Sequence, residues 1–355
     1  MHINPYLFIL PRTPAQIVWN YKDHIQHELD LDFSLRLSQL IHDPDLFDSR
    51  NTIDIQLMNA GILTVSKVDT MEWGWDELSK IYHIGTRNIP CEQVPQDSHE
   101  WSRQYLEHCN QVLAITPPKA DRALDIATRR IALPAPCAPN DDSLNRALHQ
   151  RKTCRTFTAA AIALDDVSTL LHLSFGYLHT RETTQDNIAA GLGARRSSPS
   201  GGGLNACECF LLAQNIEGLE PGIYAYHPAE HALSLVNPWP QCPLGQVLAG
   251  QHFINNLPLG LFITARFDRL WWKYEHSRAY RMAFIEAGHL SQSFQLVATA
   301  LGLNTWLTGA FDDDQVQSLL KIEGAEQPLF FVGCGESDGQ AMCQEMHDLL
   351  NEVQP

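Results

Sequence analysis

The stretch at residues 195–208, RRSSPSGGGLNACE, constrains the fold more than any other part of the chain. It passes from two arginines through Pro199 into three successive glycines, and a mainly apolar run follows as far as Ala213. Adjacent glycines let backbone N–H groups approach a flat or anionic ligand, because no Cβ stands in the way. A stretch rich in serine and glycine is also typical of a flexible loop. The apolar run predicts a helix or strand buried against a core.

Length and composition are those of an ordinary globular protein. The 355 residues are 44% hydrophobic and 19% charged, and a chain of this length more often forms two domains than one. The net charge of −16 argues against nucleic acid or an anionic membrane as the main partner, because both favour a surplus of Lys and Arg.

The nine cysteines indicate neither a disulfide framework nor a metal site. Their number is odd, and none stands in a CxxC pair or at the spacing of zinc ligands. Cys207 and Cys209 are better explained as small buried residues on one strand. The sequence has no signal peptide and no apolar run of about 20 residues. We therefore expect a cytoplasmic protein with reduced thiols and no bound metal.

Residues 1–140 are expected to form a winged-helix-like domain with linker helices. An apolar strand and a proline-punctuated turn occupy residues 5–19. Helices are expected at 29–40 and 53–61, followed by a short strand at 62–68. No basic recognition helix is visible, so a peptide-clamping or structural role is favoured over DNA binding.

A proline-rich linker at residues 131–142 leads into a second domain at residues 146–350. Apolar and alternating runs predict its strands, and amphipathic runs predict its helices. The strands are expected at 207–214, 222–226, 233–236, 259–266 and 327–333, and the helices at 165–178 and 279–301. This order predicts an α+β fold.

A basic segment at residues 151–157, RKTCRTF, is a candidate phosphate site. Its two arginines, four residues apart, can form charge-assisted hydrogen bonds with a phosphate, and the Thr153 hydroxyl adds a neutral donor. A solvated basic turn explains the same residues equally well.

Two further segments combine aromatic, polar and small residues. Residues 271–281, WWKYEHSRAYR, place Lys273 beside Tyr274, and such a pair in an aromatic pocket can serve as a general base. The alternative is the start of a surface helix with snorkelling cations. In residues 306–310, WLTGA, the glycine can let backbone amides reach the edge of a planar ring.

Four motifs in this order form a specific combination: SPSGGG, GIYAYHP, KYxxxxAYRMAxxEAG and LGL. With the basic segment, they resemble the FMN-dependent nitroreductase superfamily and, within it, the SagB-type dehydrogenases, which oxidise azoline rings in ribosomally made peptides. The resemblance covers about residues 146–340. It implies a nitroreductase-like sandwich, with a central mixed or antiparallel sheet flanked by helices, and an N-terminal winged-helix-type extension.

The resemblance also implies a role for each matching residue. The residues that contact the FMN phosphate and ribityl chain are Arg151, Lys152, Thr153 and Arg155. The residues that lie against the isoalloxazine, from the partner subunit of a homodimer, are Pro199, Ser200, Gly201 and Gly202. The residues near the N5 edge of the flavin are Thr308 and Gly309, and the catalytic pair is Lys273 and Tyr274. The sequence departs from the family pattern at Thr153, where serine is usual, and in the exit of the glycine loop at 205–208.

The implied reaction is the oxidation of a thiazoline or oxazoline to a thiazole or oxazole. Tyr274 removes the α-proton, and Lys273 either adjusts the basicity of Tyr274 or acts as the base itself. The β-hydride moves to flavin N5. The implied partners are a precursor peptide and a cyclodehydratase. Two alternatives stay open: an NAD(P)H-dependent nitro- or flavin reductase, and a non-catalytic peptide-binding scaffold. The 271–281 segment and the long N-terminal extension disfavour the reductase, because small reductases need neither.

Overall fold

The computed structural model describes residues 1–88, 93–114, 142–180 and 193–352. The chain divides into two compact units. The N-terminal unit comprises residues 1–92 together with 267–281, and the catalytic unit comprises residues 93–266 and 282–355. Residues 131–141 of the expected linker lie outside the described residues, so the domain boundary placed there stays a prediction.

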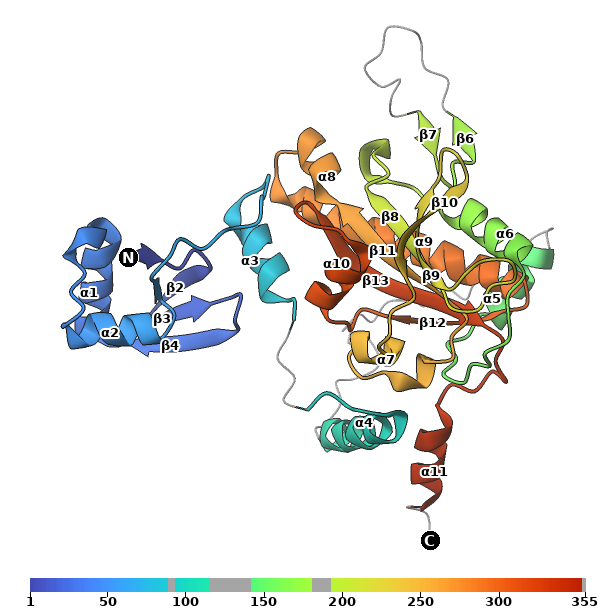
Figure 1. Cartoon of the computed structure of the whole chain (residues 1–355), viewed down its shortest axis with the longest axis horizontal. Helices are drawn as coiled ribbons and strands as arrows, with labels where there is room; N and C mark the ends of the chain where they lie inside the picture. Colours follow the sequence, from blue (N-terminus) through green and yellow to red (C-terminus); the bar gives the residue numbers. More distant parts are fainter. Residues whose placement is uncertain (89–92, 115–141, 181–192, 353–355) are drawn as a thin grey trace, which may run out of the picture. The chain divides into compact units, whose positions relative to one another are not determined.

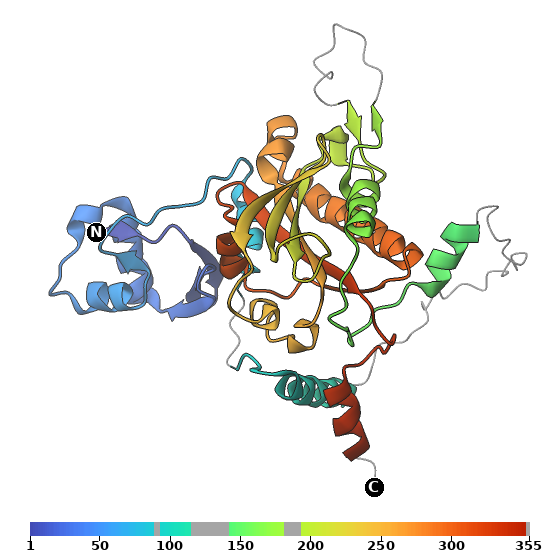
Figure 2. The same cartoon turned by 45° about the vertical axis from the view of Figure 1, so that its right-hand side comes forward.

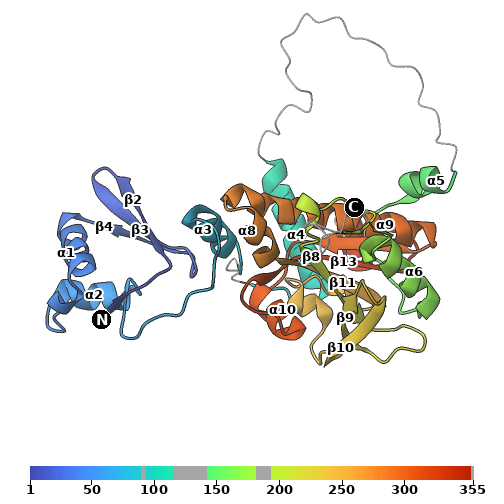
Figure 3. The same cartoon turned by 90° about the horizontal axis from the view of Figure 1, so that it is seen from above.

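A three-stranded antiparallel sheet and two helices form most of the N-terminal unit (Figure 3). The strands are β2 (Leu7–Arg12), β3 (Ala15–Asn20) and β4 (Ile25–Leu29), and the helices are α1 (Leu31–His42) and α2 (Thr52–Asn59). The expected strand and turn within residues 5–19 are confirmed by β2 and the turn that follows it, but the expectation missed β3, which completes a hairpin with β2. The expected order of helix, helix and short strand is confirmed, since β5 (Leu63–Thr64) follows α2 and pairs with β1 (His2–Ile3). The winged-helix assignment stays a prediction.

Side-chain caps begin both helices of this unit. Asp30 accepts a hydrogen bond from the backbone N–H of Phe33 at the start of α1, and Asn51 accepts from Ile53 and Asp54 at the start of α2. The helices pack on the sheet through a buried apolar cluster that comprises Val18, Leu29, Leu37, Leu40, Leu57, Ile62 and Leu63. The unit is completed by α3 (Glu77–Gly85), α8 (Phe267–Lys273) and a 3₁₀ turn at Ser277–Ala279.

A six-stranded sheet organises the catalytic unit (Figures 1 and 2). The strand order is β10-β9-β8-β11-β13-β12, and every pair is antiparallel. The strands are β8 (Cys207–Ala213), β9 (Gly222–His227), β10 (Ala232–Pro238), β11 (Leu259–Arg266), β12 (Asn304–Thr308) and β13 (Glu326–Gly335). Cys207 and Cys209 are buried on β8, as expected. The sheet with its flanking helices confirms the predicted α+β class.

Helices cover both faces of this sheet. On one face, Phe210, Phe262 and Phe331 share a core with α7 (Leu244–Val247) and α10 (Asp313–Leu320). On the other face lies α9 (Tyr280–Ala300), whose Ala283 carbonyl accepts a weak hydrogen bond from the Cys207 thiol. The expected glycine stop of α9 is confirmed, because Gly302 has a φ of 82°. The remaining helices are α4 (Ser98–Leu113), α5 (Asp142–Gln150), α6 (Leu164–Phe175) and α11 (Gln344–Glu352).

No helix in the described ranges is long and apolar enough to span a membrane.

Candidate functional site

The glycine-rich loop enters β8 through a 3₁₀ turn at Gly201–Gly203. Gly202 and Gly203 have φ values of 63° and 71°, a conformation that side chains other than glycine rarely adopt. A Cβ on Gly201 would lie 3.3 Å from the Cβ of Met282, so the loop runs close to α9. The structure therefore places the predicted residues 199–202 against the start of the long helix.

A buried carboxylate holds this loop in place. Glu286 on α9 is 2% exposed, and its Oε2 accepts a 2.6 Å hydrogen bond from Ser200 Oγ. Its Oε1 accepts a 3.1 Å bond from the backbone N–H of Cys207, at the start of β8. Ser200 Oγ in turn accepts a 2.8 Å bond from the backbone N–H of Asn205. Burial raises the pKa of the Glu286 carboxyl, although these hydrogen bonds oppose the shift.

Arg196 stands on the other side of the same carboxylate. Its guanidinium donates to the carbonyls of Phe175 and Cys207, at 2.9 and 2.6 Å, and lies 3.6 Å from Glu208 and 3.8 Å from Glu286. Arg196, one of the two cations before the glycines, thus supports the loop from its buried side. Sequence reasoning missed the part played by Glu286, although this residue stands in the EAG of the third motif.

The basic segment joins the edge strand β12. Thr153 forms a parallel bridge with Thr305, and the Cys154 N–H donates a 2.9 Å bond to the Thr305 carbonyl. Arg151 Nη1 lies 3.4 Å from both Thr153 Oγ1 and Gln295 Oε1, so a buried amide on α9 helps to orient this arginine. Nothing in the sequence pattern indicated the contribution of Gln295.

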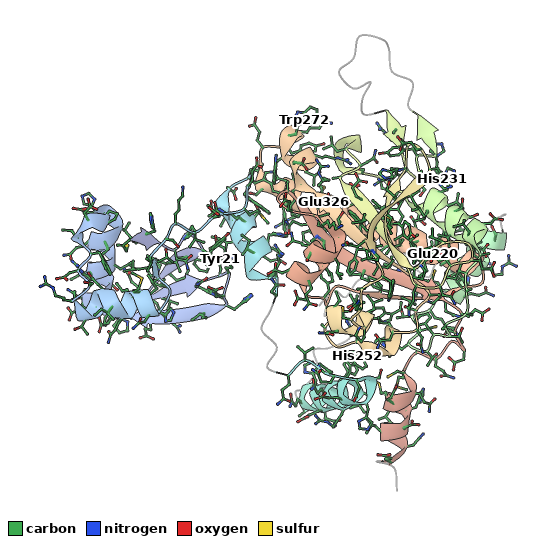
Figure 4. All side chains as sticks on the ribbon, viewed as in Figure 1. Tyr21, Glu220, His231, His252, Trp272 and Glu326 are labelled. Atoms are coloured by element: carbon green, nitrogen blue, oxygen red, sulfur yellow. The ribbon has the colours of Figure 1, made fainter. Side chains whose placement is uncertain are left out.

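The other cations of the segment face the turn after β13. Arg155 Nη1 donates a 2.6 Å bond to the Ala341 carbonyl, and its guanidinium carbon lies 6.0 Å from the centroid of the Phe253 ring. Arg155 also lines a cavity of about 480 Å³ with His252, which is labelled in Figure 4. The Lys152 ammonium lies over Gly339, where a Cβ would collide with it.

Thr308 and Gly309 stand at the end of β12. Thr308 Oγ1 accepts hydrogen bonds from Gln251 Nε2 at 3.2 Å and from the Ala310 N–H at 3.0 Å. Gly309 is exposed, and a Cβ built on it would meet only the Phe330 ring, at 3.7 Å. The backbone at Gly309 is therefore open to a flat ligand.

The predicted catalytic pair belongs to the N-terminal unit, whereas all ten predicted flavin-contact residues belong to the catalytic unit. Lys273 is the exposed last residue of α8, and its ammonium lies 5.6 Å from the ring centroid of the half-buried Tyr274. The neighbouring Trp272 is 65% exposed and is labelled on α8 in Figure 4.

The residues of the catalytic unit fit an FMN group. The basic segment carries three cations and a threonine hydroxyl, which are the kinds of donor that a phosphate requires. Arg151 faces α9, whereas Lys152 and Arg155 face the turn after β13. The glycines of the loop and Gly309 carry no side chain of their own, which suits the approach of a planar ring. Within the described ranges, no cluster of three or more His, Cys, Asp or Glu residues could hold a metal ion.

Comparison with known proteins identifies the catalytic half of the chain. The sequence model described as "Nitroreductase family" matches residues 148–336, more than half of the 355 residues. MJ1384 of Methanocaldococcus jannaschii, provisionally named a nitroreductase, is 28% identical over 54% of this chain and 90% of its own length.

Two further relatives are named for peptide processing. The trifolitoxin-processing protein TfxB of Rhizobium leguminosarum bv. trifolii is 26% identical over 46% of this chain and 44% of its own length. The microcin B17-processing protein McbC of Escherichia coli is 31% identical over 36% of this chain and 49% of its own length. The chain thus spans less than half of either of these two relatives.

Proposed function

The chain belongs to the nitroreductase family, and we propose that it is an FMN-dependent oxidoreductase that matures a ribosomally made peptide. Its proposed reaction converts thiazoline or oxazoline rings to thiazole or oxazole. The observation that carries the proposal is the Lys273–Tyr274 pair, in a segment that resembles the azoline dehydrogenases. Two of the relatives, TfxB and McbC, are named for peptide processing. The proposed partners are therefore a precursor peptide and a cyclodehydratase.

The oxidation removes two hydrogens from the ring. Tyr274, with Lys273 beside it, takes the α-proton as general base, and the β-hydrogen leaves as hydride. FMN, when bound, supplies the acceptor for that hydride, and oxygen or another oxidant restores it. Arg151, Lys152, Thr153 and Arg155 would contact the phosphate and ribityl chain, while the glycine loop, Thr308 and Gly309 would line the ring. Loss of the two hydrogens makes the heterocycle aromatic, which drives the step.

An absorption spectrum of the purified protein tests this proposal first. We expect a yellow protein that releases FMN on denaturation and is not bleached by anaerobic NADPH. A thiazoline-containing model peptide should bleach the flavin and lose two hydrogens in the mass spectrum. Rapid bleaching by NADPH would favour the reductase, and a colourless protein that takes up no FMN would favour the scaffold.

Substitutions separate cofactor binding from chemistry. Tyr274→Phe and Lys273→Ala should keep the flavin and lose turnover of the model peptide. Arg155→Ala and Arg151→Ala should lose flavin, whereas Arg146→Ala, an exposed arginine on α5, should keep it. Full activity in Tyr274→Phe would show that another group is the base.

We also propose that the protein is a homodimer with shared flavin sites. Large apolar side chains are exposed on two helices of the catalytic unit, Leu144 and Leu148 on α5 and Phe284 and Ile285 on α9. Leu144 and Leu148 are four residues apart, so they lie on one face of α5, and an exposed apolar face is a candidate interface. Light scattering should give the mass of a dimer for the wild type and of a monomer for Leu144→Asp/Leu148→Asp, and the monomer should bind less flavin. A wild-type monomer that binds FMN fully would contradict shared sites.

A further inference from the structure

The segment that carries Lys273 and Tyr274 has its packing partners outside the family domain. Residues 267–281 lie inside the matched range 148–336, yet they belong to the compact unit of residues 1–92. Residues outside the matched range therefore supply part of the packing of this segment.

Hydrogen bonds link this segment to residues 75–83 at Tyr274, Ser277 and Tyr280. Trp75 Nε1 donates a 2.9 Å bond to the Tyr274 carbonyl. Ser79 Oγ lies 3.0 Å from Ser277 Oγ. The buried His83 Nδ1 lies 2.9 Å from the Tyr280 hydroxyl. The bonds are three residues apart, so they restrain the second half of the segment, from Tyr274 to Tyr280.

Aromatic packing surrounds these bonds. Trp271 meets the Trp75 ring edge-on at 5.5 Å between centroids and lies 6.1 Å from Trp73. Gly74 lies between the two tryptophans in sequence, and a Cβ there would collide with the Trp271 indole. The close packing of α8 on residues 73–75 thus requires a glycine at position 74.

The Trp75 bond acts on the backbone of the candidate base. Trp75 is 8% exposed, so its N–H is not easily satisfied by water when the bond is lost. A fixed carbonyl restricts the backbone from which the Tyr274 side chain projects. A general base is effective only in a narrow range of positions, and a small displacement costs much of the rate.

We propose that Trp75 is a positioning residue for Tyr274, and that the hydrogen bonds from residues 75–83 of the N-terminal unit hold the catalytic segment in its working conformation. This inference rests on the proposed function. It gives the N-terminal unit a role in catalysis that is independent of any peptide binding.

The test compares two tryptophans of the same cluster in the full-length holoprotein. Trp75→Phe removes the donor to Tyr274, while Trp73→Phe removes a matched donor, 3.1 Å from Ser79 Oγ, that does not contact Tyr274. We expect Trp75→Phe to keep its flavin and to lose kcat for the thiazoline peptide by about tenfold or more, with KM within about twofold. Trp73→Phe should stay within about twofold in kcat.

Hydrogen exchange supplies a readout that does not depend on activity. Residues 267–281 should exchange faster in Trp75→Phe than in the wild type or Trp73→Phe. The milder Ser277→Ala, which removes a bond farther along the segment, should give a smaller effect and covers the case that Trp75→Phe misfolds. Equal exchange and equal kcat in the two tryptophan variants would overturn the inference. A wild type that turns over no azoline would instead overturn the proposed function and leave the exchange result to judge the contact.

Discussion

Each compact unit buries one carboxylate beside an arginine, and the two pairs titrate in opposite directions. In the N-terminal unit, Asp54 is fully buried and accepts hydrogen bonds from Nε and Nη2 of Arg36, at 2.6 and 2.7 Å. The Asp48 N–H adds a third bond at 2.8 Å. The bonds from Arg36 hold the pKa of Asp54 below its usual range. In the catalytic unit, burial instead raises the pKa of Glu286.

The difference in pKa follows from which acceptors each guanidinium donates its hydrogen bonds to. Arg36 directs its guanidinium at Asp54 and thereby joins α1 to α2. Arg196 gives its shortest bonds to two backbone carbonyls and stands 3.8 Å from Glu286, so desolvation outweighs attraction there. The direct ion pair of Arg36 and Asp54 holds two helices together. The longer contact of Arg196 with Glu286 belongs to a network that supports the glycine-rich loop, a candidate ligand site.

The largest effect is expected from Asp54→Ala. Removal of the carboxylate leaves the largely buried Arg36 with the Leu46 carbonyl and the Gln39 amide but without its anionic partner, and such a loss typically costs about 3–5 kcal/mol. Urea unfolding, with hydrogen exchange of the α1 and α2 peptides, measures the loss. The control is Arg50→Ala, which breaks an exposed ion pair with Asp48 and should cost less than about 1 kcal/mol. An equal loss of unfolding free energy in the two variants would contradict the role of the Arg36–Asp54 ion pair in joining α1 to α2.

Glu286→Ala should cost less, about 2–3 kcal/mol, because Arg196 keeps Glu208 and two carbonyls as partners. The loss should loosen residues 199–207 and weaken FMN binding. Urea unfolding and flavin titration measure the two effects. Unchanged flavin affinity in a folded variant would show that the loop does not contact the cofactor.

The pH dependence of stability should differ in sign between the two carboxylates. The lowered pKa of Asp54 contributes stability above the usual aspartate pKa, and this is lost as the pH falls through the lowered value. The raised pKa of Glu286 contributes stability below the usual glutamate pKa, and this is lost as the pH rises through the raised value. Unfolding free energies against pH, with Asp54→Asn and Glu286→Gln as references, should show the two slopes. Slopes of the same sign would refute the comparison.

The smallest effect is expected from Ser200→Ala, about 1 kcal/mol, since one hydrogen bond to Glu286 is lost and the Asn205 N–H loses its acceptor. That bond lowers the pKa of Glu286, so the variant should raise it further. A steeper loss of stability with rising pH is the expected signature. An unchanged pH profile would place Ser200 outside the network.

The sequence predicted the elements of the catalytic unit better than those of the N-terminal unit. The mainly apolar run of β11 has the predicted bounds, and α9 differs by one residue at each end, because both carry a strong local pattern. In the N-terminal unit, Pro11 suggested that a strand had ended, yet β2 continues through it. Since β2 is an edge strand, the missing N–H of Pro11 is tolerated there.

The sequence by itself determined the α+β class, the nitroreductase resemblance and the segments that carry candidate chemistry, because glycines, cations and apolar runs act through local conformation. Only the tertiary structure decided which residues support those segments. Glu286 lies 86 residues from Ser200, and Trp75 lies 199 residues from Tyr274. Contacts over such separations leave no periodic pattern in the chain, because they depend on how whole elements pack. For that reason the supporting roles of Glu286 and Trp75 became visible only in the folded protein.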